Sequence, residues 1–358
     1  IWTDGLLLGN GDLGTLFYAP YHLRWIINKI DVYDFRFDAP EHLTHAEAIK
    51  AIKEGMDIEE LIGVKEKSKR NGHRPGPKSC AELQICFDRH TAYPNWCPPH
   101  KISAEIDLPS ASMKINADKH QSHPRIHSFV HAERNIMVLR IKDNSHITPP
   151  AVVELLSIEE PDMPPVKWLI KNGILFMVRE IPESMTVVTA IKIVSNGWGG
   201  FADTMKKHFR KKYWQLPTEN PEPVFKEKKG YFIINGDFDI FLTVTTSREY
   251  SNPVEKAEEI INTSVSEGFE GCFEQHRKWW NNFWSKSSVI LEDDFLECLW
   301  YFSLYALASQ YRKPPASALL GLCFGPPEEP GASQPWGGIY TNDQNSQMPP
   351  MPCWATNH

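Results

Sequence analysis

Short runs of β-branched and aromatic residues fill roughly the first 248 residues, and they constrain the fold most strongly. Each run is bounded by Asn, Asp, Gly or Pro, which is typical of strands joined by turns. The runs cover residues 22–35, 81–87, 111–117, 125–143, 173–180, 186–194 and 230–247. Residues 129–141 alone are a candidate hairpin. So many short strands predict a large antiparallel β-sandwich.

One helix is expected to interrupt these strands. Thr44 and Glu47 have the spacing of a capping box, in which each side chain bonds a backbone N–H of the first helical turn. The helical pattern then continues to about Gly63.

The pattern changes near Asn252, where helical periodicity takes over. Asn252 followed by Pro253 predicts a helix start, because Asn caps free N–H groups and Pro fits the first helical position. The next large side chains recur at intervals of three and four, which places them on one helical face. They are Phe269, Phe273, His276, Trp280 and Phe283.

A further helix is predicted to begin with a capping box formed by Asp294 and Glu297. The segment from 295 to 311, FLECLWYFSLYALASQY, is apolar on nearly every side, so we expect it to be buried all round. Pro314 and Pro315 should end it. We therefore expect three parts: a β domain over residues 1–250, a helical linker over 251–292, and a truncated all-helical domain over 293–358.

Composition excludes several classes of protein. The net charge of −7 and the lack of a basic stripe argue against a nucleic-acid partner. No window approaches the roughly 18 apolar residues of a membrane span, so no membrane partner is expected. The chain begins with Ile1, as if its front were cut, so the lack of a signal peptide does not define the compartment.

The seven cysteines include no Cys-x-x-Cys pair, so we expect no zinc site of that type, no other metal and no cofactor. Most of them should be small buried side chains. A disulfide of Cys80 or Cys86 with Cys97 is possible, but spacing does not decide it.

Two motifs suggest chemistry and are better explained by structure. Gly9, Gly11 and Gly14 match the spacing of a dinucleotide fingerprint, but the segment that follows is β-rich, so we expect a tight turn with positive φ instead. His120, His123, His127 and His131 lie close in sequence. Because four residues of strand span about 13 Å, we expect a surface row of imidazoles and not a metal site.

The closing segment, residues 335–358, is rich in aromatic and amide side chains. In an extended segment Asp343 and Asn345 point the same way and can bind hydroxyl groups or orient a water. Trp336, Tyr340 and Trp354 offer flat faces that suit sugar rings. A Pro- and Gly-rich loop packed by aromatic residues explains the same pattern equally well.

Several segments resemble glycoside hydrolase family 95, the α-L-fucosidase and α-L-galactosidase family. They are GLLLGNGDLGTLFYA (5–19), LRWIINKIDVYD (23–34), HRKWWNNFWSKSSVIL (276–291) and PWGGIYTNDQNSQMPPMPCWATNH (335–358). The resemblance implies an N-terminal super-β-sandwich, a helical linker and the start of an (α/α)6 barrel that carries the active site. It also implies that the rest of the barrel is missing from this sequence.

The resemblance assigns roles to the closing segment. Asn345 matches the second of two Asn residues that help a carboxylate to activate water, and Asp343 replaces the first. Gln347 and His358, with Trp336, Tyr340 and Trp354, are expected to bind a glycan. The general acid would lie beyond His358, so the fragment itself should be inactive. The replacements, including Cys323 where a Trp is usual, favour a divergent relative with another sugar preference or a degenerate one.

The resemblance thus implies inverting hydrolysis of α-glycosides in the parent protein, and the family's habitat implies a periplasmic or extracellular location. A sugar phosphorylase with the same domain plan is one alternative. A non-catalytic carbohydrate-binding domain is another.

Overall fold

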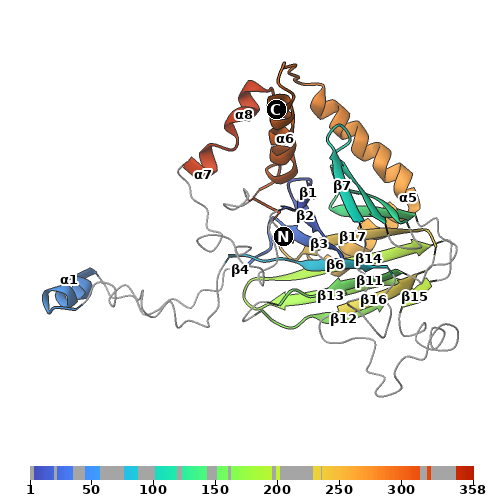
Figure 1. Ribbon diagram of the computed structural model, residues 1–358. Coiled ribbons are helices and arrows are strands. Elements are labelled where there is room, and N and C mark those ends of the chain that lie inside the picture. The colour runs from blue at the N-terminus through green and yellow to red at the C-terminus, as the bar shows by residue number, and fades with distance from the viewer. Residues whose placement is uncertain are drawn as a thin grey trace.

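The computed structural model describes most of the β-rich part and the helices that follow it. The described residues are 4–19, 22–34, 45–56, 76–87, 101–118, 123–142, 151–159, 163–195, 199–201, 229–234, 236–314, 321–323 and 344–358. Large antiparallel sheets come first in the chain and long helices come after them, which confirms the predicted fold class (Figure 1).

The first sheet has seven strands, all in antiparallel pairs. In spatial order they are β1 (Leu6–Gly9), β2 (Leu13–Tyr18), β3 (Leu23–Lys29), β6 (Ala81–Cys86), β11 (Ala151–Leu156), β16 (Lys229–Ile234) and β15 (Gly199–Phe201). A separate small ribbon pairs β4 (Tyr33–Asp34) with β5 (Gly76–Pro77).

The second sheet has eight strands and is also antiparallel throughout. In spatial order they are β12 (Lys167–Lys171), β13 (Ile174–Ile181), β14 (Met185–Ser195), β17 (Phe238–Thr246), β10 (Ile136–Lys142), β9 (Arg125–Val130), β8 (Ser112–Asp118) and β7 (Lys101–Asp107). Pairing of Val130 with Met137 confirms the hairpin expected over residues 129–141.

The core lies between the two sheets and follows the two-residue alternation of strands. Trp25 and Leu83 from the first sheet are completely buried together with Leu139 and Leu242 from the second. Phe241, the neighbour of Leu242, points to the opposite face of its sheet and belongs to another apolar cluster. The central strands β10 and β17 of the second sheet are therefore buried on both faces.

Helix α5 (Pro253–Trp284) covers that other face. The Asn252 side chain accepts a hydrogen bond from Glu255 N at 3.2 Å, and Pro253 occupies the first turn, as predicted. Ala257 and Ile261 pack against the sheet. The helix breaks at Gly268, where φ is 67° and ψ is 179°. After the break it carries the expected face, in which Phe269, His276, Trp280 and Phe283 are buried and Phe273 is half-buried.

Helix α6 (Asp294–Gln310) is capped one residue earlier than predicted. Asp293, not Asp294, accepts from Phe295 N at 2.9 Å and from Leu296 N at 3.1 Å, because its extended backbone aims the carboxylate at the first turn. The helix ends at Gln310, ahead of Pro314. In the part of the chain that the structure describes, no helix is long and apolar enough to cross a membrane.

Helix α1 (His45–Lys53) is shorter than predicted. Gly55, with φ of +88°, ends it by donating to Ile52 O at 3.1 Å, while Met56 N donates to Ala51 O at 3.0 Å. This pair of bonds is a glycine-based helix stop, which satisfies the last carbonyls and turns the chain away. The expected continuation toward Gly63 is therefore wrong for residues 54–56, and residues 57–63 lie outside the described part.

Candidate functional site

The closing segment forms two short helices, α7 (Gln344–Gln347) and α8 (Met351–Ala355). Asn345 and Gln347 lie on α7, so the extended backbone expected at residues 344 and 345 is wrong. A helical turn forms here because Met348 N bonds to Gln344 O at 2.9 Å. The predicted residues Asp343, Trp336 and Tyr340 lie outside the described part of the chain.

The segment presents large apolar side chains to solvent. Trp354 on α8 is 85% exposed, and Met348 and Met351 are 57% and 51% exposed. An exposed indole offers a flat face of the kind that packs on apolar ring faces. The arrangement is thus compatible with the binding role predicted for Trp354.

His358 lies at the other end of α8 and contacts α5. Its ring centroid is 4.0 Å from that of Phe283. Its Nε2 is 3.0 Å from Phe283 O, and its Nδ1 is 3.0 Å from Thr356 Oγ1. The structure thus brings His358 onto α5 and leaves Trp354 facing solvent.

The glycine motif forms the turn between β1 and β2, and it receives the end of α6. Gly11 has the predicted positive φ, +82°, but Gly9 and Gly14 do not. Close packing explains those two instead: a Cβ at Gly9 would lie 2.4 Å from Ser309 O, and one at Gly14 would lie 2.6 Å from the nearest side-chain atom. A Cβ at Gly11 would lie 2.5 Å from Arg312 N. Gly9 and Gly11 therefore let the end of α6 approach the turn closely, and Gly14 leaves room for Leu322.

The buried side chain of Asn10 stabilises this turn through hydrogen bonds. Its Nδ2 donates to His131 O at 2.9 Å and to Arg134 O at 3.0 Å. Its Oδ1 accepts from the backbone N–H groups of Asp12 at 3.0 Å and Leu13 at 2.8 Å. One buried amide therefore connects the β1–β2 turn to the β9–β10 turn.

A buried ion cluster lies beside the turn. The Lys29 Nζ is 2.7 Å from Asp12, 2.8 Å from Asp31 and 2.8 Å from Glu249, and its side chain has no exposed surface. Burial alone would raise the pKa of Asp12, but Lys29 and Lys313, the latter 3.2 Å away, lower it below its ordinary value. Lys313 follows α6, so this cluster also attaches that helix to the sandwich.

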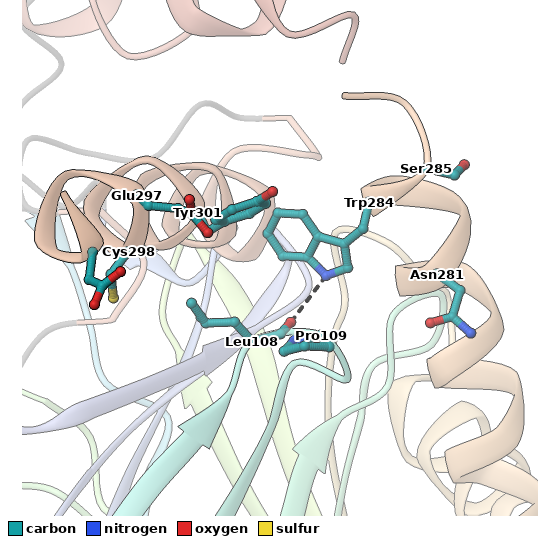
Figure 2. A pocket seen from close by; sticks show the side chains of 9 residues that line it. Leu108, Pro109, Asn281, Trp284, Ser285, Glu297, Cys298 and Tyr301 are labelled. Carbon is teal, nitrogen blue, oxygen red and sulfur yellow. Dashed lines mark hydrogen bonds between the residues drawn. The ribbon is translucent and has the colours of Figure 1, made fainter. Parts of the chain in front are cut away.

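A cavity of about 750 Å³ lies between the end of α5, the start of α6 and the turn after β7 (Figure 2). Its walls are Leu108, Pro109, Asn281, Trp284, Ser285, Asp294, Glu297, Cys298 and Tyr301. The Trp284 indole donates to Leu108 O at 3.1 Å. The Tyr301 hydroxyl donates to Val289 O at 3.0 Å, and Glu297 accepts from Leu291 N at 2.7 Å.

The two carboxylates of the cavity do not form a glycosidase pair. Asp294 and Glu297 project from a single turn of α6. Hydrolysis of a glycoside with two carboxyl groups needs them on opposite sides of the bond. Within the described residues, this cavity therefore supplies aromatic and hydrogen-bonding surface but not the acid and base.

The predicted surface row of histidines is wrong for the two that α5 covers. His123 is exposed, but the His127 ring packs 5.2 Å from Phe269, and His131 is only 1% exposed. The residues of α5 cover the face of β9 that we expected to meet water. His120 lies outside the described residues, among which no cluster of His, Cys, Asp and Glu could hold a metal ion.

The cysteines that the structure describes include three buried ones, Cys80, Cys86 and Cys272. Burial raises the pKa of Cys80 to about 12, so its thiol stays protonated at neutral pH. Cys97, the possible disulfide partner, lies outside the described part.

Comparison with known proteins supports the architecture. No protein-family model and no curated protein matches the sequence. A putative kojibiose phosphorylase from human microbiome aligns over 93% of this chain and 42% of its own, with a TM-score of 0.56 and 12% identity. A bacterial glucoamylase, solved with acarbose, aligns over 88% of this chain and 42% of its own, with a TM-score of 0.51 and 10% identity.

At these identities the likeness is one of fold. The chain spans 42% of the length of each of these enzymes. It therefore shares the fold of part of two carbohydrate-active enzymes, and membership in the α-L-fucosidase family stays a prediction.

Proposed function

We propose that this chain is the sandwich, the linker and the first barrel helix of a glycoside hydrolase that cleaves α-glycosides with inversion. Sugars of the fucose or galactose type are the proposed substrates. The supporting observation is the order of sandwich, linker helix and apolar helix, which aligns over 93% and 88% of the chain with a phosphorylase and a glucoamylase.

The exposed apolar face of α6 supports the proposal that this helix belongs to a helical barrel. Phe295 is 72% exposed, Leu296 50%, Leu299 48% and Phe302 40%, whereas Leu304 and Tyr305 pack on the sandwich side. An apolar face of this size is normally covered by other helices. We propose that further barrel helices of the same polypeptide cover it.

We assign the proposed roles to residues of the closing segment. Asp343 and Asn345 would orient or activate the attacking water, while Trp336, Tyr340 and Trp354 would stack on the sugar. Gln347 on α7 would bind a hydroxyl group. The general acid would be supplied by the barrel, so residues 1–358 alone would not turn over substrate.

The test uses the complete polypeptide encoded with this chain and an aryl α-fucoside or α-galactoside. Asp343→Asn and Asn345→Ala are each expected to lower kcat by about 100-fold or more, because an unactivated water attacks slowly. Asp118→Asn is the matched control, since that carboxylate lies at the exposed end of β8 in an ion pair with Arg125. Full activity in Asp343→Asn would refute the role of Asp343.

A sugar phosphorylase is the second candidate, favoured by the likeness to a putative kojibiose phosphorylase. In such an enzyme phosphate takes the place of the attacking water. Release of a sugar phosphate that requires added inorganic phosphate would establish this reaction. Release of free sugar in phosphate-free buffer would exclude it.

A further inference from the structure

A continuous stack of flat groups runs along one side of α5. The Arg312 guanidinium lies 4.0 Å above the Trp279 ring. Trp279 stacks on Phe283 with ring centroids 5.5 Å apart and planes 17° apart. The His358 ring lies at the end of this row, 4.0 Å from Phe283 and tilted by 37° to it. Because Trp279 and Phe283 are four residues apart, the helix itself places them in one column.

The imidazole of His358 is engaged through both nitrogens. Nε2 faces the Phe283 carbonyl at 3.0 Å, and a carbonyl only accepts, so Nε2 carries the hydrogen and donates. That carbonyl lies in the last turn of α5, where the helix dipole favours donors. Nδ1 lies 3.0 Å from Thr356 Oγ1.

The turn at the C-terminal end of α8 places the His358 side chain against α5. Asn357 has φ of +60°, a left-handed conformation that Asn adopts more readily than most residues. Thr356 is buried, and its backbone N–H donates to Pro352 O at 3.1 Å. His358 N then donates to Cys353 O at 2.9 Å, which closes the helix. The turn therefore reverses the chain and presents the imidazole to α5.

The opposite end of the stack is fixed to the sandwich. Arg312 donates to Asn10 O at 2.7 Å and to Ala132 O. Burial lowers the pKa of Arg312 to about 10, which still leaves it charged at neutral pH. The negative face of an aromatic ring attracts a cation held above it in this way. The stack thus connects the β1–β2 turn to the closing segment through α5.

We propose that His358 is a positioning residue that anchors the α7–α8 segment to the linker helix. The anchor fixes the place from which Gln347 and Trp354 reach a glycan, and this role rests on the function proposed above. His358 itself does not touch the sugar. Its partners are the Phe283 ring, the Phe283 carbonyl and the Thr356 hydroxyl.

Amide hydrogen exchange on this chain tests the anchor without any assay of activity. In His358→Ala we expect amides of residues 344–357 to exchange about tenfold faster, because the substitution removes both a hydrogen bond and the packing of two rings. His358→Gln keeps a donor for the carbonyl and should restore part of the protection. Met351→Ala, at an exposed position of the same segment, is the control and should exchange like the parent.

Strand β17 should keep its protection in every variant, which shows that the sandwich remains folded. Unchanged exchange of residues 344–357 in His358→Ala would overturn the proposal. So would equal loss of protection in Met351→Ala, because the effect would then not be specific to the imidazole.

Kinetics on the complete polypeptide separates positioning from binding. An anchor predicts that His358→Ala lowers kcat about tenfold and that His358→Gln recovers part of it. If His358 instead bound the sugar equally well in the ground and transition states, its removal would raise KM alone. A change in KM alone would therefore overturn the positioning role. Faster exchange in His358→Ala together with no glycosidase activity in the parent would support the anchor and refute the proposed hydrolase.

Discussion

Gly11 combines a backbone that other residues rarely adopt with a close approach that leaves no room for a side chain. Its φ is +82°, and the Cβ of an alanine would lie 2.5 Å from Arg312 N. The sequence motif predicted the turn. It did not predict the close approach, because the partner lies about 300 residues away and only the folded chain brings it to the turn.

Gly11→Ala should therefore destabilise the protein more than the same substitution at a glycine that has a positive φ but open space around it. We expect a loss of about 3 kcal/mol, of which roughly 1–2 kcal/mol comes from the backbone and the rest from displacing Arg312. Gly236→Ala is the matched control, since its φ is also +82° and no atom lies within 4 Å. Urea unfolding of both variants measures the difference. Equal losses would contradict the close approach.

Lys29 balances buried carboxylates that would otherwise repel one another. Lys29→Met should lower the free energy of unfolding by about 3–5 kcal/mol, because Asp12, Asp31 and Glu249 lose their shared cation. Chemical denaturation at neutral pH measures this loss. A loss below about 1 kcal/mol, the range of an exposed pair, would show that the cluster is solvated. Exposed Lys167→Met, whose partner is Glu180, is the comparison.

Two buried histidines, His131 after β9 and His276 on α5, predict the response to acid. Burial lowers the pKa of His276 to about 3 and that of His131 to about 4, with the cations Arg134 and Arg312 nearby. The unfolded chain takes up protons near pH 6.5, while the folded chain does not, so stability present above pH 6.5 is lost as the pH falls toward 4.

At pH 5 each histidine should lower the free energy of unfolding by about 2 kcal/mol relative to its value at pH 7. His276→Gln keeps a donor for the Ser110 carbonyl, 2.8 Å from the ring nitrogen, and removes one titrating group. Its unfolding free energy should fall less steeply between pH 7 and pH 5. A slope equal to that of the parent would show that His276 is protonated in the folded protein.

At the scale of elements, the local sequence pattern predicted helices and strands correctly where apolar residues follow the period of the element. The strand runs, the Asn252–Pro253 helix start and the apolar face of α5 were all confirmed. Strands β7, β11 and β12 were missed, although Ile102, Ala104 and Ile106 alternate with polar residues in β7. The His127 error had another cause: a strand does not show which of its faces a distant helix will cover.

Helix α6 provides the test at this scale. In residues 1–358 alone, the double variant Leu299→Gln/Phe302→Gln should leave the unfolding free energy within about 0.5 kcal/mol of the parent value and reduce self-association, because both side chains are partly exposed. Leu304→Gln, on the buried face, should cost about 3 kcal/mol. Light scattering and urea unfolding measure the two effects. A large loss in the double variant would show that this face is already packed.

At the scale of the whole molecule, the candidate site depends on parts that meet only after folding. The closing segment suggested sugar chemistry from its residue types, and two of its predicted site residues, Asn345 and Gln347, lie together on α7. The packing of His358 on Phe283, 75 residues away, had no local signal. The cavity between α5 and α6 also had no local signal in the sequence, since its walls come from three separate segments.

Inverting hydrolysis of an α-glycoside is the proposed activity, and the configuration of the first product tests it most directly. Proton NMR would follow the complete polypeptide acting on an aryl α-glycoside in phosphate-free buffer. Inversion predicts that the β-anomer of the free sugar appears first and then mutarotates. Initial release of the α-anomer, or no hydrolysis of any α-glycoside tested, would contradict the account.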